Sequence, residues 1–191
     1  GPLTQFQIGS MLSIQKAGFD VVVWSIDPLE LPTGIENRDS GELVDKDLLD
    51  EYLYIHWKDE DYPKEKSRAV FYSDLVRIYA VAKHGGWWFD CDIFCVKPVQ
   101  WFNEEYKKYP LAIGSEFGGG WVSNAAFAIP DPELAKKLIE LVDGLLASRR
   151  VFNWGELGPV VFNTLIANEL PHFRPMPWHT FYSTLSHYEG L

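Results

Sequence analysis

Residues 73–98 read SDLVRIYAVAKHGGWWFDCDIFCVKP, and this stretch decides the fold because a helix pattern leads directly into a strand pattern. Its first half spaces apolar residues as one face of a helix does, and the pair Gly85-Gly86 ends that pattern. The second half is rich in aromatic and β-branched residues, which favour strands. The stretch therefore predicts a helix over 68–84, which Ser67 can cap, and a strand over 87–96.

The rest of the chain continues this alternation. Further helices are predicted over 5–17, 132–147 and 156–168, and further strands over 19–26, 111–114 and 121–129. Thr4 and the pair Asp131-Pro132 are typical helix-start residues. Alternating helices and strands predict one α/β domain over 1–191, with a mostly parallel sheet flanked by helices.

The charge of the chain excludes one class of function. The chain has 191 residues and a formal net charge of −10, whereas a protein that reads a nucleic-acid backbone needs a basic surface. Residues 36–68 hold 11 acidic and 6 basic side chains. We interpret that segment as a solvated helical and loop excursion, with an acidic docking surface as the alternative.

The two cysteines do not indicate a disulfide framework. On a strand, Cys91 and Cys95 would have Cα atoms about 13 Å apart, whereas a bridge needs less than about 7 Å. Free thiols predict a reducing, cytoplasmic compartment. The sequence has no apolar run of the roughly 18–20 residues that span a bilayer and no visible signal peptide.

The helix predicted over 68–84 carries charges within its apolar face. At about 100° per residue, Asp74 and Arg77 lie about 60° apart, on the same third of the circumference as Val70, Ile78 and Val81. An unpaired charge there would be costly. Asp74 and Arg77 are therefore either an ion pair that joins the helix to the sheet, or a pair directed at a polar ligand.

The strand predicted over 87–96 carries two carboxylates. Because side chains alternate along a strand, Asp90 and Asp92 would project from one face, about 6–7 Å apart. A divalent cation would relieve their repulsion, and oxygen ligands completed by substrate phosphates suit Mg²⁺ or Mn²⁺. The alternative is two exposed acids at a strand edge.

Together these residues resemble a known family. SDLVR (73–77), HGGWWFDCD (84–92) and VKP (96–98) are similar to the sugar-binding region of the DxD-motif glycosyltransferases, the family-32-like group. That group includes the yeast initiating α-mannosyltransferase, capsular polysaccharide transferases and the glucosylating clostridial toxins. Weaker similarity extends over most of the chain, carried by GPLTQF, FDVVVWSID, WVSNAAFAIPDP and GELGPVVFNTL.

The resemblance implies a GT-A-like fold and a retaining glycosyltransferase that moves a hexose from a UDP- or GDP-sugar to a glycan or lipid-linked acceptor. It implies that Asp90 and Asp92 hold Mn²⁺ or Mg²⁺ on the diphosphate. The other residues implied in donor binding are Asp74, Arg77, Gly85, Gly86, Asn124 and Glu156. No catalytic base is assigned. The resemblance also points to a bacterial or viral source, and a peripheral position at a membrane is compatible with it.

Relative to the family pattern, the chain lacks the first strand, and its tail HYEGL lacks a segment that completes the metal site in relatives. We therefore expect a domain truncated at both ends. Two other functions remain open. One is an aspartyl-nucleophile phosphatase, which shares the Asp-x-Asp strand end but has small residues after it, where this chain has Ile93-Phe94. The other is a catalytically inactive nucleotide-sugar-binding module.

Overall fold

The computed structural model describes residues 2–55, 63–115, 121–176 and 180. The helices in this part of the chain are α1 (Gln5–Lys16), α2 (Leu48–Glu51), α3 (Lys64–His84), α4 (Val99–Tyr106), α5 (Pro132–Ser148) and α6 (Val161–Glu169). The strands are β1 (Val22–Ser25), β2 (Glu36–Asp39), β3 (Leu53–Ile55), β4 (Trp87–Phe89), β5 (Ala112–Ser115), β6 (Val122–Ala128) and β7 (Val151–Asn153). Short 3₁₀ and π-type turns lie at Ser40–Glu42 and Glu156–Val160.

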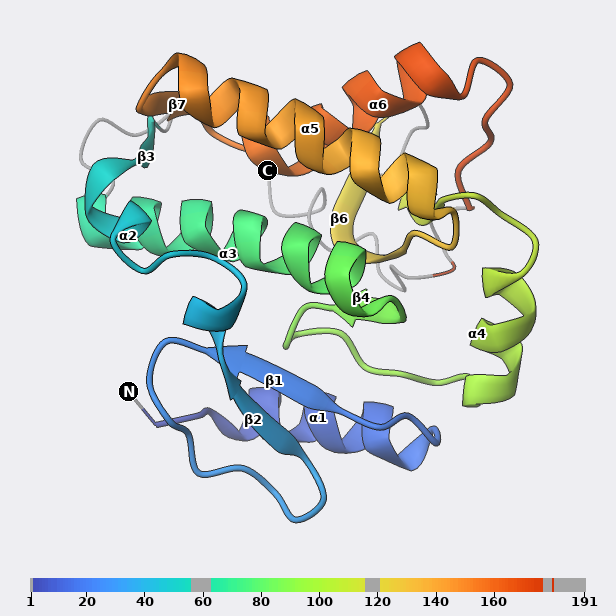
Figure 1. Cartoon of the computed structure of the whole chain (residues 1–191). Helices are drawn as coiled ribbons and strands as arrows, with labels where there is room; N and C mark the ends of the chain where they lie inside the picture. The colour runs from blue at the N-terminus through green and yellow to red at the C-terminus, as the bar shows by residue number, and fades with distance from the viewer. Residues whose placement is uncertain (1, 56–62, 116–120, 177–179, 181–191) are drawn as a thin grey trace, which may run out of the picture.

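Helix α3 runs through the middle of the molecule, with α5 and α6 on one side and the layer of α1, β1 and β2 on the other (Figure 1). Its residues Phe71, Leu75 and Ile78 are fully buried. They recur at helical spacing, and Tyr72, Val76 and Val81 from adjoining sides of α3 join them in the main core, so more than one face of the helix is buried. The helix thereby separates two layers, and polar groups on it can face either side.

The helix starts were predicted well where a capping residue is present. The Thr4 hydroxyl accepts the Gln7 N–H at 3.2 Å, and the Asp131 carboxylate accepts the Glu133 N–H at 2.9 Å. The start of α3 was predicted incorrectly. The helix begins at Lys64, after Pro63, and the hydroxyl of Ser67 donates to the Tyr54 carbonyl instead of capping the helix. A serine that bonds a neighbouring strand cannot be distinguished from a capping serine in the sequence.

The α/β class is confirmed, but the prediction of a mostly parallel sheet is wrong for the described residues. Strands β1 and β2 form one parallel pair, and β3 and β7 form another. The third sheet is antiparallel, in the order β4-β6-β5. Strand direction depends on the path of the connections, and β6 follows β5 after a connection too short for a parallel crossover. Alternation of side chains carries no information about direction.

The strand predicted over 87–96 ends early, at Phe89. The Asp90 N–H still donates to the Ala125 carbonyl at 2.8 Å, and the Ile93 N–H then donates to the Asp90 carbonyl at 3.1 Å, which closes a turn. The sequence predicted that Asp90 and Asp92 project from one face of a strand. This prediction is wrong, because both residues come after the end of β4. The partner strand β6 continues in this direction to Val122, so the ladder stops because the chain turns away after Asp90.

Segment 36–68 is more than the solvated excursion that its charges predicted. It contributes β2, which pairs with β1, and β3, which pairs with β7. Tyr52 and Tyr54 from this segment are buried, at 4% and 2% exposure. The segment was predicted to be solvated because charged residues outnumber the few buried aromatic residues among them in the sequence. Residues 56–62 of the segment lie outside the described part of the chain.

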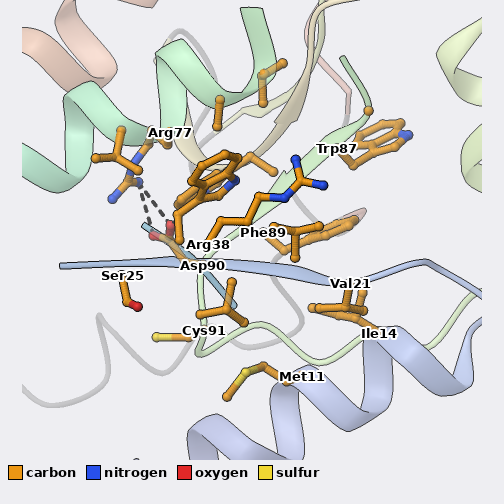
Figure 2. Close-up of a pocket in the computed structure, with 18 of the residues that line it drawn as sticks. Met11, Ile14, Val21, Ser25, Arg38, Arg77, Trp87, Phe89, Asp90 and Cys91 are labelled. Carbon is orange, nitrogen blue, oxygen red and sulfur yellow. Dashed lines mark hydrogen bonds and ion pairs between the residues drawn. The ribbon is translucent and has the colours of Figure 1, made fainter. Parts of the chain in front are cut away.

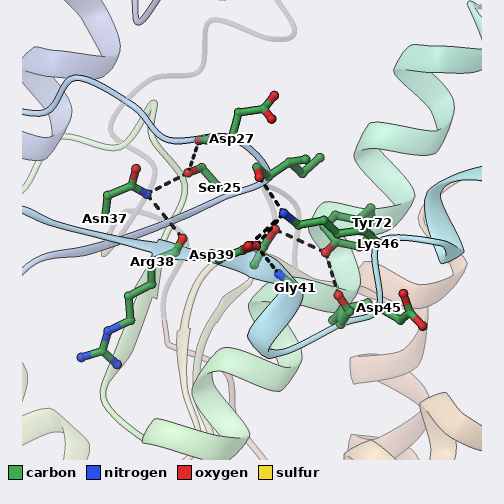
Figure 3. Close-up of polar contacts among 12 residues, drawn as sticks. Ser25, Asp27, Asn37, Arg38, Asp39, Gly41, Asp45, Lys46 and Tyr72 are labelled. Atoms are coloured by element: carbon green, nitrogen blue, oxygen red, sulfur yellow. Dashed lines mark hydrogen bonds and ion pairs between the residues drawn. The ribbon is translucent and has the colours of Figure 1, made fainter.

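A polar network joins the β1–β2 layer to α3 (Figure 3). The Lys46 ammonium donates to the Ile26 carbonyl at 2.8 Å and to the Asp39 carboxylate at 3.0 Å. The Tyr72 hydroxyl, on α3, donates to the Val44 carbonyl at 2.8 Å. These bonds hold the layer at a defined distance from α3, which matters because a cavity lies between the two.

Two further findings concern the cysteines and the helices. Both cysteines are free thiols, with Cys91 exposed and Cys95 half-buried. Within the described residues, none of the helices combines the length and the apolar character needed to cross a membrane.

Candidate active site

The polar centre of the molecule is the face of α3 that carries Asp74 and Arg77. Both side chains are buried, at 4% and 8% exposure, and the Arg77 Nε lies 3.4 Å from the Asp74 Oδ1. The ion pair considered from the sequence is therefore present. Because burying two charges in this way is expensive, the surrounding residues must supply further hydrogen bonds.

The Asp74 carboxylate receives those bonds from two other elements. Its Oδ2 accepts the Tyr54 hydroxyl at 2.7 Å, and its Oδ1 accepts the Asn124 side-chain amide at 2.8 Å. Asn124 lies on β6 and is 5% exposed. The structure thus brings Asn124, which the sequence resemblance placed in the site, into direct contact with Asp74.

Arg77 connects this group to the Asp-x-Asp motif. Its Nη1 donates to the Asp90 carboxylate at 3.2 Å and to the Asn124 carbonyl at 3.1 Å, while its Nη2 donates to the Ser73 hydroxyl at 3.0 Å. Burial opposes the charged guanidinium, but the neighbouring carboxylates of Asp74 and Asp90 outweigh it and raise the pKa of Arg77. The arginine is a permanent cation between two acids.

The two acids of the motif occupy different environments. Asp90 is largely enclosed, and its Oδ1 accepts the indole N–H of Trp88 at 2.7 Å. Burial raises the pKa of Asp90 above its usual range, although the charge of Arg77 acts in the opposite direction. Asp92 is exposed in the turn that follows β4. The structure therefore makes Asp90 the anchored acid and Asp92 the accessible one.

A cavity of about 750 Å³ lies between α3 and the β1–β2–α1 layer. Arg77, Asp90 and Asp92 line it, together with Trp24 of β1 and Arg38 of β2. Figure 2 shows Arg77 and Trp87 on one side of this cavity, with Met11 and Ile14 on the other. Its size and its mixture of aromatic and charged walls suit a ligand as large as a nucleotide.

A second, smaller cavity of about 330 Å³ lies next to Asp74. Asn124, Trp154 and Gly155 also line it, and Arg77 is common to the walls of both cavities. Arg77 is therefore a wall that the large and the small cavity share. This arrangement, one ion-paired arginine shared by a nucleotide-sized cavity and a smaller one, is the main chemical feature of the site.

The glycines predicted to lie against a ligand line the large cavity. Gly85 and Gly86 have φ angles of +69° and +78°, which L-residues with side chains rarely adopt. The Gly85 N–H donates to the Val81 carbonyl at 2.8 Å and ends α3. No atom lies within 4 Å of where a side chain would start at Gly86, so that backbone is open to a ligand.

Glu156 is placed differently from the other predicted residues. Its carboxylate pairs with the Arg149 guanidinium and accepts the Asn153 N–H at 2.6 Å. It is not among the described residues that line either cavity. These contacts stabilise the turn that carries Gly155 into the small cavity, and no contact with Asp74 or Arg77 is seen among the described residues.

Glu156→Gln is expected to change how stability depends on pH. Partial burial raises the pKa of Glu156, but the bonds from Arg149 and Asn153 outweigh this and lower it overall. A lowered folded-state pKa means that the stabilisation is complete above the unfolded value of about 4.3 and is lost as pH falls. The variant should therefore cost about 1 kcal/mol at pH 7 and less at pH 3.5, as measured by urea unfolding.

Glu104→Gln is the control for this measurement, because its side chain is 66% exposed in a surface pair with Lys107. That variant should differ little from the unmodified protein at either pH. If the cost of Glu156→Gln were the same at pH 7 and pH 3.5, the carboxylate would not be stabilised in its charged form.

The carboxylates of Asp90 and Asp92 are suitable ligands for a divalent cation, but they do not form a complete coordination shell by themselves. Among the described residues, no group of three His, Cys, Asp or Glu side chains lies close enough to hold a metal ion. Mg²⁺ and Mn²⁺ are commonly bound by one or two carboxylates together with substrate phosphates and water. Asp92, exposed at the large cavity, and the anchored Asp90 meet that requirement.

Several residues of the site were not found from the sequence. Arg38 and Trp24 line the large cavity, and Arg38 lies in the charged segment interpreted as an excursion, while Trp24 lies in a strand interpreted as core. Tyr54, which lines neither cavity in the described part of the chain but bonds Asp74, lies in the same charged segment. Arg38 lies over the Trp24 ring at 5.6 Å from its centroid. The alternation of tyrosines in YLYI was a usable signal for a buried strand, but nothing local indicates which cavity a residue faces.

The chain is similar to known proteins in sequence and in fold. Residues 38–118, which contain Asp74, Arg77 and both motif acids, match the family model described as capsular polysaccharide synthesis protein. Among solved structures, the PaToxG glycosyltransferase is similar, with a TM-score of 0.57 and 13% sequence identity. The similarity covers 90% of this chain and 65% of that one, so this chain spans about two thirds of its length. No curated protein matches the chain.

The resemblance to DxD-motif glycosyltransferases is thereby confirmed, by sequence in the segment that holds the motif and by fold over most of the chain. The fold of the chain is similar to that of a glycosyltransferase, and its residues 38–118 match the sequence pattern of the capsular polysaccharide synthesis protein family.

Proposed function

We propose that the protein is a metal-dependent, retaining glycosyltransferase that moves a hexose from a UDP- or GDP-sugar to a glycan or lipid-linked acceptor. The observation that carries the proposal is the position of Arg77, which is bonded to the acids of both motifs and forms a wall of both cavities. The large cavity is the place for the nucleotide, and the small cavity takes the sugar. The diphosphate that joins these two parts then passes Arg77.

The residues of the chain have distinct roles in this reaction. Within the described residues, four of the five N–H donors of an arginine are directed at protein acceptors, which leaves one for a phosphate or sugar oxygen. Asp74 and Asn124 present polar atoms to the hexose, and Gly85-Gly86 let the ligand approach the backbone. Asp92, with Asp90 behind it, would hold Mn²⁺ or Mg²⁺. A bound cation would neutralise charge on the leaving diphosphate.

The transfer breaks the bond between the anomeric carbon and the diphosphate oxygen, and the electron pair leaves with the nucleoside diphosphate. The acceptor hydroxyl oxygen forms the new bond on the same face, and its proton passes to an oxygen of the leaving phosphate. No side chain is assigned as a base. Asp90 is not a phosphatase nucleophile in this proposal, because Arg77 and Trp88 already bond its carboxylate. The free thiols support a cytoplasmic location for the reaction.

A panel of nucleotide sugars tests the proposal. UDP-glucose, UDP-galactose, UDP-N-acetylglucosamine, GDP-mannose and GDP-fucose are each incubated with the protein, with and without Mn²⁺, and released nucleoside diphosphate is measured. At least one of these nucleotide sugars should release its nucleoside diphosphate in a Mn²⁺-dependent manner. The same sugar should raise Tm when bound.

Other outcomes of the panel identify the alternative functions. Release of inorganic phosphate without nucleoside diphosphate would indicate a phosphatase. A rise in Tm with no release, even with added glycan acceptors, would indicate an inactive nucleotide-sugar-binding module. Neither release nor a Tm shift with any sugar would refute the proposal.

A further inference from the structure

Tyr54 and Gly158 lie on either side of the Asp74 carboxylate, and neither was recognised from the sequence as part of the site. We propose that they are positioning residues, which fix the Asp74 carboxylate and the Asn124 amide at the wall of the small cavity. Neither residue lines a cavity in the described part of the chain. The turnover arm of the test below rests on the proposed function, and a second arm does not.

The Tyr54 hydroxyl links the backbone to the site. It donates to the Asp74 Oδ2 at 2.7 Å and accepts the Leu157 N–H at 3.1 Å, and the residue is only 2% exposed. Burial and the nearby negative charge of Asp74 raise the pKa of this phenol, so it remains a donor. With both of these bonds made, the hydroxyl can occupy a single orientation.

Gly158 closes the other side of the carboxylate. A Cβ built at this glycine would lie 2.9 Å from the Asp74 Oδ2, 3.0 Å from its Oδ1 and 2.9 Å from the Asn124 Nδ2. These separations are far below van der Waals contact. Any side chain at position 158 would therefore push the carboxylate and the amide away from each other or into the small cavity.

The three contacts converge from separate parts of the chain. Tyr54 comes from β3, Asn124 from β6, and Gly158 from the turn before α6, while Asp74 stands on α3. A carboxylate with this many fixed neighbours is held in one position before any ligand arrives. Such preorganisation favours reaction because no reorganisation is needed when the sugar enters.

The simpler explanation is that Tyr54 only stabilises the core, and the chain offers a matched control for it. Tyr52 is also buried, at 4% exposure, and its hydroxyl donates to the Leu146 carbonyl at 3.1 Å, far from Asp74 in the network. Both tyrosine rings pack against Phe71. Loss of either hydroxyl should therefore have a similar effect on stability, while only one affects the site.

The experiment compares Tyr54→Phe, Tyr52→Phe, Gly158→Ala and Gly144→Ala. Gly144 lies in α5, and no atom lies within 4 Å of where its side chain would start. With the sugar that the panel identifies and Mn²⁺, Tyr54→Phe should lower kcat about tenfold and Gly158→Ala more than tenfold. Both should bind the product UDP or GDP, with Mn²⁺, within about twofold of the unmodified protein. Tyr52→Phe and Gly144→Ala should change neither quantity.

Equal effects of Tyr54→Phe and Tyr52→Phe on kcat would overturn the inference, as would unchanged kcat in both Tyr54→Phe and Gly158→Ala. If the unmodified protein turns over no sugar, the proposed function fails and a second measurement decides the inference. The side-chain amide signals of Asn124 are assigned by NMR with Asn124→Asp. Tyr54→Phe should shift them and Tyr52→Phe should not, whereas unshifted signals in Tyr54→Phe would refute the positioning role.

Discussion

Asp92→Asn is expected to abolish Mn²⁺-dependent release of nucleoside diphosphate, with a loss of about 100-fold or more. A metal that stabilises charge on the leaving group contributes several kcal/mol, and each 1.36 kcal/mol corresponds to a factor of ten. The fold should not change, because Asp92 is exposed in a turn. Tm should stay within about 2 °C of the unmodified protein when measured without Mn²⁺.

Asp47→Asn serves as the control, because Asp47 is also an exposed acid and makes no side-chain capping bond. It should retain full turnover. Asp90→Ala is a less informative test, since it would also leave the buried Arg77 without one of its partners. Unchanged Mn²⁺-dependent turnover in Asp92→Asn would exclude this carboxylate from the metal site.

The second large effect is expected for Arg77→Ala, in both stability and binding. Removing one partner of a buried ion pair costs about 3–5 kcal/mol, because the remaining charges stay buried and unpaired. Here Asp74 and Asp90 would both lose the same cation. For a chain of this length we expect Tm to fall by about 10 °C. Calorimetry below the new Tm should show weaker binding of the nucleotide sugar.

Lys107→Ala is the matched control, since Lys107 forms an ion pair with Glu104 at the same three-residue spacing, with side chains 69% and 66% exposed. An exposed pair of this kind contributes about 0–1 kcal/mol. If Arg77→Ala lowered Tm but left the affinity for the nucleotide sugar unchanged, Asp74 and Arg77 would have a purely structural role.

The sequence predicted those parts of the fold that depend on neighbouring residues. The apolar spacing of residues 73–84 and the two glycines after it are local features, and they place α3 and its end correctly. The cap at Asp131 likewise starts α5 at Pro132. The prediction of the start of α3 failed, because the partner of Ser67 is the carbonyl of Tyr54, thirteen residues earlier in the chain.

Pairing between strands could not be predicted in this way. Each of the β strands is short, and its alternation fits a parallel or an antiparallel partner equally well. The partner of β3 is β7, nearly a hundred residues away, and the two meet because α3 and α5 pack together. Such contacts depend on the whole chain, so the segment around Tyr54 was interpreted as solvated although Tyr52 and Tyr54 are buried.

The sequence alone determined which residue types the site contains. Asp74, Arg77, Asp90 and Asp92 stand at fixed positions on one helix and the turn after one strand, and this local order was sufficient to suggest the family. Only the tertiary structure decided their roles. It anchors Asp90 to Arg77 and leaves Asp92 exposed, and it surrounds Asp74 with Tyr54, Asn124 and Gly158. The physical reason is that a charge acts through its neighbours in space, and burial on folding sets those neighbours.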